Sequence, residues 1–122
     1  LLASYNIEPS PTLPQDVHIN FYRIAQEALN NVLKHAEAKR VTVGLVAAPP
    51  ADPEADADWQ GQMMLRIADD GRGFEQGEQG PDKLGLGIMH ERAETIGAEL
   101  NIETHMGQGT RVILVWPSKT PR

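Results

Sequence analysis

The 122-residue chain contains no cysteine, which excludes disulfide bonds, thiolate metal ligands and cysteine nucleophiles. Aromatic residues make up only 5% of it, so aliphatic side chains and methionine must fill the core. No apolar run approaches the roughly 18 residues that a membrane-spanning helix needs. Basic residues are few as well: 11 Lys and Arg stand against 17 Asp and Glu, a formal charge of −6. Nucleic-acid-binding proteins usually carry the opposite sign. The composition therefore predicts one globular domain with no nucleic-acid partner.

The negative charge is concentrated in residues 47–61, which are rich in alanine, proline and acidic side chains. Four carboxylates lie there: Asp52, Glu54, Asp56 and Asp58. This composition predicts a solvated loop or a partly disordered insertion that joins two paired strands. The overall charge thus describes this acidic insertion more than the rest of the chain.

Apolar residues recur at helical spacing over residues 17–38, with Asp16 as the expected N-cap. The apolar stripe comprises Phe21, Ile24, Ala25, Ala28, Leu29, Val32, Leu33 and Ala36. A second helix is predicted over residues 88–96, ending at Gly97. Alternating or β-branched runs predict strands over residues 4–8, 40–46, 62–69, 99–105 and 110–116. The order is not the regular alternation of a parallel sheet. It predicts an α+β fold, a two-layer sandwich whose mixed, mostly antiparallel sheet carries helices on one face.

The long helix also carries a polar stripe. Glu27, Asn31 and Lys34 stand at i, i+4 and i+7, within one narrow arc that Asn20 and Arg23 extend. A carboxylate, an amide oxygen and an ammonium group could serve phosphate chemistry by orienting a nucleophile, holding Mg²⁺ and balancing phosphate charge. The alternative is a solvated helix face with a polar i, i+4 pair.

Three glycine-rich segments occur one after another in the second half of the chain. Asp69 ends a strand on its core-facing side, and Gly71 and Gly73 would let the backbone approach a flat ligand closely. A buried carboxylate needs a donor, for which the exocyclic amine of a purine is suitable. Gly85-Leu86-Gly87 opens the second helix, whose amides attract phosphate. The hairpin turn Gly107-Gln108-Gly109-Thr110 completes the series. Taken singly, each segment is also explained by a turn that needs glycine.

Together, these motifs resemble those of the Bergerat-fold ATPases, the family shared by gyrase, Hsp90, MutL and histidine kinases. Residues 23–36, RIAQEALNNVLKHA, look like the N box. Asp69-Asp70-Gly71-Arg72-Gly73-Phe74 looks like the first glycine box, residues 85–87 like the second, and residues 107–110 like the closing G-x-G-T element. The amino-acid sequence of residues 23–36 and 85–100 resembles that of sensor histidine kinases that partner NarL-type response regulators.

The resemblance implies an ATP site in which Asp69 accepts a hydrogen bond from the adenine amine and Thr110 supports it. Asn31 would hold Mg²⁺, Glu27 would orient the acceptor or act as base, and Lys34 would contact phosphate. Residues 75–84 would form the ATP lid. The remaining residues implied at the nucleotide are Gly71, Gly73, Phe74, Lys83, Gly85, Leu86, Gly87 and the ring of His35.

As a kinase domain of this family, the chain would lack a phosphoacceptor of its own. His90-Glu91 imitates an acceptor pair but falls in the second predicted helix, so we interpret it as a surface pair. The resemblance implies a helical dimerisation and phosphoacceptor domain upstream, and a response regulator as partner. The isolated domain is expected to be monomeric and cytoplasmic, in a homodimeric parent that could be anchored in the inner membrane. The alternatives are an anti-sigma-factor serine kinase and a nucleotide-binding module without catalysis. No histidine or carboxylate spacing indicates a zinc site.

Overall fold

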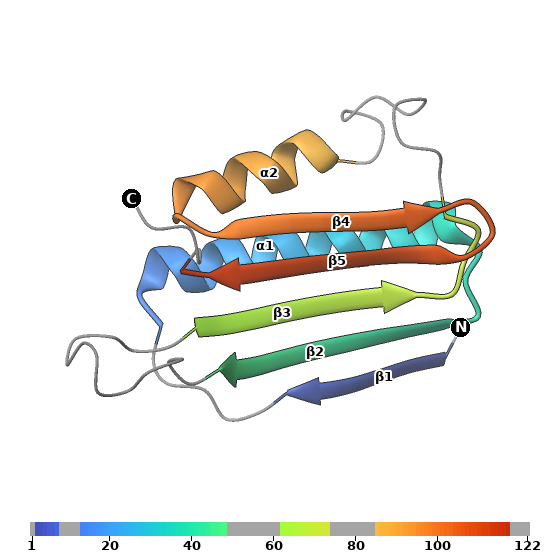
Figure 1. Cartoon of the computed structure of the whole chain (residues 1–122), viewed down its shortest axis with the longest axis horizontal. Coiled ribbons are helices and arrows are strands. Elements are labelled where there is room, and N and C mark those ends of the chain that lie inside the picture. Colours follow the sequence, from blue (N-terminus) through green and yellow to red (C-terminus); the bar gives the residue numbers. More distant parts are fainter. Residues whose placement is uncertain (1, 8–12, 49–61, 74–84, 118–122) are drawn as a thin grey trace.

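The computed structural model describes residues 2–7, 13–48, 62–73 and 85–117 (Figure 1). It is a two-layer α+β structure in which helices cover one face of a five-stranded sheet, with α1 running behind β4 and β5 in Figure 1. The predicted fold class is thus confirmed. The elements are β1 (Leu2–Ile7), α1 (Gln15–Asn31), the π-helical turn η1 (Val32–Ala36), β2 (Arg40–Ala48), β3 (Gln62–Asp69), α2 (Leu86–Thr95), β4 (Glu99–His105) and β5 (Gly109–Trp116).

The strands lie in the order β1-β2-β3-β5-β4. Only β1 and β2 pair in parallel, and the other neighbours are antiparallel. The predicted bounds of β3 and β4 agree with the structure, while β1, β2, β5 and α2 differ by one or two residues at their ends. The pairing of β2 with β3 confirms that the acidic segment joins two paired strands, although residues 49–61 lie outside the described residues.

The core lies between the sheet and the two helices. Four side chains with less than 2% exposure come from four different elements: Ile24 of α1, Ile67 of β3, Met89 of α2 and Leu114 of β5. On β3 the buried residues Met63, Leu65 and Ile67 alternate with more exposed ones, as the period of two predicts. Aliphatic and methionine side chains therefore form most of the core, as the scarcity of aromatic residues predicts.

The helix predicted over residues 17–38 is wrong at both ends. It begins at Gln15, with Pro14 as N-cap, and the carbonyl of Pro14 accepts the N–H of His18 at 3.0 Å. Asp16 therefore lies in the first turn, where its charge favours the helix dipole, rather than at the N-cap. At the other end, the chain widens into η1, and Glu37 ends it in a left-handed conformation with φ of 52°. Leu33, predicted to be in the core, is 70% exposed because this wider turn changes the periodicity.

The second helix ends as predicted at Gly97, which has φ of 71°. The N–H of Ala98 bonds to the carbonyl of Ala93 at 2.9 Å, and that of Gly97 bonds to Glu94 at 3.1 Å. This pair of bonds is a Schellman motif, which turns the chain directly into β4. The indole N–H of Trp116 then donates to the carbonyl of Ile96 at 2.8 Å and ties the end of β5 to the end of α2. None of the helices in the described ranges has the length and apolar character needed to cross a membrane.

Candidate active site

The end of α1, the end of β3 and the tip of the β4–β5 hairpin all lie at one end of the molecule (Figure 1). In the sheet register, Asp69 is directly opposite Thr110. The N–H of Gly107 at the hairpin tip donates to the carbonyl of Arg72 at 2.6 Å. The first glycine box and the closing G-x-G-T element, which are far apart in the sequence, are therefore adjacent in space.

Asp69 is half-buried on the helix-covered side of β3, the side on which Leu65 and Ile67 are buried. Its carboxylate accepts the N–H of Gly71 at 2.8 Å. Burial raises the pKa of Asp69, while hydrogen bonds from the backbone N–H groups of Gly71 and Thr110 oppose the rise. Asp69 thus lies on the core-facing side that the strand alternation predicts, and backbone donors hold its carboxylate at a partly desolvated strand end.

Two glycines leave no room for a side chain beside Asp69. A Cβ on Gly73 would collide with the carbonyl oxygen of His105, and one on Gly109 would collide with the carbonyl oxygen of Asp69. Both have positive φ, 64° and 90° respectively. These positions need glycine both for the backbone conformation and for the close approach of neighbouring chains. The result is a narrow seam of bare backbone between the end of β3 and the tip of the β4–β5 hairpin.

Thr110 is supported by Thr104, a residue that the sequence reasoning missed. The two hydroxyl oxygens are 3.0 Å apart, and the Thr104 hydroxyl also lies 3.4 Å from the carbonyl oxygen of Gly109. Thr104 is only 7% exposed. Its position in the alternation of β4, on the same side as Leu100 and Ile102, was the available signal. The hydroxyl of Thr110 is thus oriented by a buried neighbour.

The N-box residues lie at different positions around the end of α1. Glu27 and Asn31 are half-buried on α1, whereas Lys34 is exposed and belongs to η1. Because the turn widens after Asn31, the predicted stripe through Lys34 is not continued at α-helical spacing. Asn20 does not continue it as an exposed group either: it is 8% exposed and accepts a hydrogen bond from Arg92 of α2 at 3.3 Å. Asn20 therefore links α1 to α2 through this hydrogen bond.

The second glycine box opens α2, where Gly85 is the N-cap with φ of 66°. Leu86 and Gly87 are the first two helical residues, so their N–H groups have no acceptor within the helix. Glu27 and Gly85 are in direct contact, because a Cβ on Gly85 would lie 2.6 Å from the Cδ of Glu27. The structure therefore brings the N box and the second glycine box together. His35 falls in η1, and Phe74, Lys83 and the predicted lid lie outside the described residues.

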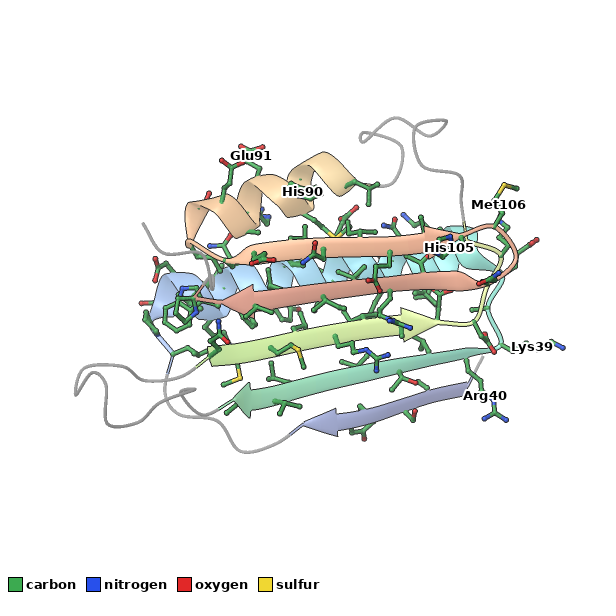
Figure 2. The ribbon with its side chains drawn as sticks, viewed as in Figure 1. Lys39, Arg40, His90, Glu91, His105 and Met106 are labelled. Carbon is green, nitrogen blue, oxygen red and sulfur yellow. The ribbon has the colours of Figure 1, made fainter. Side chains whose placement is uncertain are left out.

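The predicted surface pair His90-Glu91 is exposed on α2 (Figure 2). Within the described ranges, no three histidine or carboxylate side chains form a group that could hold a metal ion. Mg²⁺ takes one or two protein oxygens and completes its shell with substrate phosphates and water, and the half-buried Asn31 at the end of α1 carries such an oxygen.

Asp70 has a structural role that its place in the motif did not reveal. Its Oδ1 accepts hydrogen bonds from the backbone N–H groups of Lys39 and Arg40, each at 2.9 Å, and so fixes the start of β2. Lys39 and Arg40 are labelled at this end of β2 in Figure 2. The hydrogen bond from the Arg40 N–H is the largest of the effects that lower the pKa of Asp70.

Substituting Asp70→Ala is expected to lower the melting temperature at neutral pH, because both N–H groups lose their acceptor. A lowered folded-state pKa stabilises the fold above the unfolded-state pKa, and this stabilisation is lost as pH falls through the folded-state value. The difference in melting temperature between parent and variant is therefore expected to shrink between about pH 7 and pH 3. Thermal unfolding across this range measures it, with Asp70→Asn, which keeps an acceptor oxygen, as the control. A difference independent of pH would contradict this role.

Nearly the whole of this chain matches known proteins, both in sequence and in fold. The family model for histidine kinase-, DNA gyrase B-, and HSP90-like ATPases matches residues 16–120. The sensor protein VraS of Staphylococcus haemolyticus (strain JCSC1435) is 35% identical over 100 residues, which is 82% of this chain and 26% of VraS. The chain thus spans only 26% of the length of this curated relative, and the same is true of the VraS protein of Staphylococcus epidermidis, at 34% identity.

Two solved structures share the architecture. The histidine kinase domain of the Erythrobacter litoralis EL346 blue-light activated histidine kinase aligns with a TM-score of 0.71 at 25% identity, covering 95% of this chain and 51% of that one. Full-length ShkA in complex with AMPPNP has the same fold, with a TM-score of 0.71 at 20% identity over 95% of this chain and 25% of ShkA. With the motifs in order, Asp69 beside Thr110 and the family match over residues 16–120, this chain belongs to the histidine kinase-, DNA gyrase B- and HSP90-like ATPase family.

Proposed function

We propose that this chain is the ATP-binding catalytic domain of a two-component sensor histidine kinase. It would present the γ-phosphoryl group of ATP to a histidine on a helical dimerisation domain, for onward transfer to a response regulator. The observation that carries the proposal is Asp69, a half-buried carboxylate held by backbone donors beside glycines that leave no room for a side chain. That combination suits a flat base with an exocyclic amine, as adenine has.

The positions of the described residues support several of the remaining roles. Thr110, oriented by Thr104, would support the contact to adenine, and Gly71 and Gly73 would line the base. The N–H groups of Leu86 and Gly87, which have no acceptor within the helix, suit phosphate, as does the positive end of the helix dipole. Gly85 belongs to the same phosphate-binding turn. We further propose contacts to the nucleotide from Phe74, Lys83 and His35, and a lid over residues 75–84.

Mg²⁺, when bound with the nucleotide, would neutralise phosphate charge, and Asn31 offers it an amide oxygen at the end of α1. Lys34 would balance charge on the phosphates from η1. In transfer, an imidazole nitrogen bonds to the γ-phosphorus, and the bond to the bridging oxygen breaks with its electron pair leaving on ADP. Glu27 would accept a hydrogen bond from the other imidazole N–H and so orient the ring. Positioning and charge neutralisation supply most of the catalysis in such reactions.

The proposal extends to the whole protein. The chain would form one domain over residues 1–122, placed after the dimerisation domain in a homodimeric parent. Its response regulator would be of the NarL type, which the amino-acid sequence of residues 23–36 and 85–100 supports. The domain would work in the cytoplasm, with the parent anchored in the inner membrane.

The first test is calorimetric titration of the chain with a non-hydrolysable ATP analogue, with Mg²⁺ and with a chelator. Saturable binding that weakens on chelation is expected. Asn31→Ala is expected to weaken binding about tenfold with Mg²⁺ present, a loss close to one hydrogen bond to a charged group, and to leave binding in chelator unchanged. Equal losses in both conditions would contradict a metal-binding role for Asn31.

The second test uses the full parent protein and labelled ATP. A phosphohistidine is expected, which is labile to acid and stable to base. A product with the opposite stability would indicate a protein serine kinase, and saturable binding with no labelled protein would indicate a nucleotide-binding module without catalysis. Either outcome would overturn the proposed histidine kinase activity.

A further inference from the structure

The contact between Glu27 and Gly85 joins the two catalytic motifs. A Cβ built on Gly85 would lie 2.6 Å from Cδ and 2.8 Å from Cγ of Glu27, and closer still to its Oε1. Glu27 therefore lies directly against the α-carbon of Gly85. Gly85 itself is buried, as the N-cap of α2. The glutamate carboxylate is thus placed at the positive end of a helix dipole, which favours a negative charge there.

Other described glycines with positive φ show that this contact is distinct from the need for a left-handed backbone. Gly97 and Gly107 have φ of 71° and 81°, and a Cβ at either would meet nothing within 4 Å. At Gly73 and Gly109 the obstructing atoms belong to the backbone. At Gly85 they belong to the flexible side chain of Glu27, which can move away. A methyl group at Gly85 would therefore displace the carboxylate before it disturbed the fold.

We propose that Gly85 is a positioning residue for Glu27: by having no side chain, it fixes where the carboxylate stands relative to the phosphate-binding turn of α2. This inference rests on the proposed function, in which Glu27 orients the accepting imidazole. It gives Gly85 a second role in addition to its contact with phosphate. The catalytic carboxylate and the phosphate-binding turn are then one unit, and moving one changes the other.

The test compares Gly85→Ala with Gly97→Ala. Gly85 precedes α2 and Gly97 follows it, and their φ angles are nearly the same, 66° and 71°. Both variants therefore carry the same backbone strain. Only the methyl group at position 85 meets Glu27. The ¹³C resonance of the Glu27 carboxyl group, assigned by its loss in Glu27→Gln, reports the placement without any turnover. We expect it to move in Gly85→Ala and to stay unchanged in Gly97→Ala.

In the full parent protein, Gly85→Ala is expected to lower kcat for phosphotransfer about 10- to 100-fold, because a displacement of about 1 Å can cost this much. The affinity for the nucleotide analogue is expected to fall by a smaller factor than kcat, since the backbone N–H groups of the phosphate-binding turn remain. Combining Gly85→Ala with Glu27→Asp, whose shorter side chain avoids the methyl group, is expected to restore part of the lost kcat.

Three results would overturn the inference: a Glu27 resonance that does not move, a kcat no lower than that of Gly97→Ala, or losses that simply multiply in the double variant. Failure of the proposed function is distinguishable from these. If the unmodified protein transfers no phosphate while the Glu27 resonance still moves in Gly85→Ala, the histidine kinase activity is overturned and the placement of Glu27 by Gly85 is supported.

Discussion

Replacing Asp69 by asparagine is expected to weaken binding of an ATP analogue by about 10- to 100-fold, the range for losing a hydrogen bond to a charged group. The backbone N–H groups of Gly71 and Thr110 donate hydrogen bonds to the Asp69 carboxylate. In the variant they would donate to the amide oxygen of asparagine instead. Its NH₂ group would then face the adenine amine, and two donors cannot bond to each other. Isothermal titration with Mg²⁺ and the analogue measures the loss.

The stability of Asp69→Asn separates this effect from unfolding. Because burial raises the pKa of Asp69, the folded state favours the protonated acid. The stability of the parent therefore falls as pH rises through the interval from the unfolded-state pKa to the folded-state pKa, and the cost persists at neutral pH. Asparagine removes that cost, so the variant is expected to melt no lower than the parent at pH 7.

The neighbouring carboxylate provides a matched control. Asp70 is exposed and bonds to Lys39 and Arg40, on the side away from the glycine seam. Asp70→Asn makes the same chemical change one residue along and is expected to bind the analogue like the parent. Comparable binding by Asp69→Asn and the parent, or equal losses in both variants, would show that Asp69 does not recognise the base.

A second large effect is expected at Gly109, where an added methyl group would destabilise the fold by about 3 kcal/mol or more. Its φ of 90° is unfavourable for alanine, which alone costs about 1–3 kcal/mol. The new Cβ would also collide with the carbonyl oxygen of Asp69 and lie 3.2 Å from the α-carbon of Asp70. Because these atoms belong to the backbone, relief requires β3 and β5 to separate. Urea unfolding of Gly109→Ala measures the loss.

Gly107→Ala serves as the control for Gly109→Ala because it lies in the same hairpin, with φ of 81° and open space around the added Cβ. It carries only the cost of a left-handed alanine, about 1–2 kcal/mol. The difference between the two variants isolates the close approach of β3 and β5. Equal destabilisation would contradict the tight seam beside Asp69.

Much of the fold follows from local patterns in the sequence. The alternation of Met63, Leu65 and Ile67 predicted the bounds of β3 and the side on which Asp69 lies, because side chains on a strand alternate strictly. Gly97 predicted the end of α2, because only glycine takes that conformation at no cost. The glycine boxes could be identified in the sequence because glycine marks backbone conformations that other residues adopt only at a cost.

Features that depend on neighbouring elements were not predictable in this way. The periodicity of residues 17–38 does not show the widening at η1, so Leu33 was wrongly placed in the core. Asn20 looked like part of the polar stripe, but α2 packs against it and supplies Arg92. Asp70 accepts hydrogen bonds from Lys39 and Arg40, which are remote in the sequence, and nothing local to Asp70 reveals those partners. Thr104 bonds to Thr110 across its own hairpin, and the alternation of β4 alone indicated that it is buried.

The register of β3 on β5 has a consequence for how the domain folds. The β4–β5 hairpin can close locally, but Asp69 meets Thr110 only after the chain has passed through all of α2 and β4. Closing so long a loop costs entropy that nearby contacts cannot offset early, so such pairings form slowly. The two residues proposed to recognise adenine are therefore expected to come together late in folding. A partly folded chain would have no base-recognition site, and the recovery of nucleotide binding during refolding would follow the completion of the sheet.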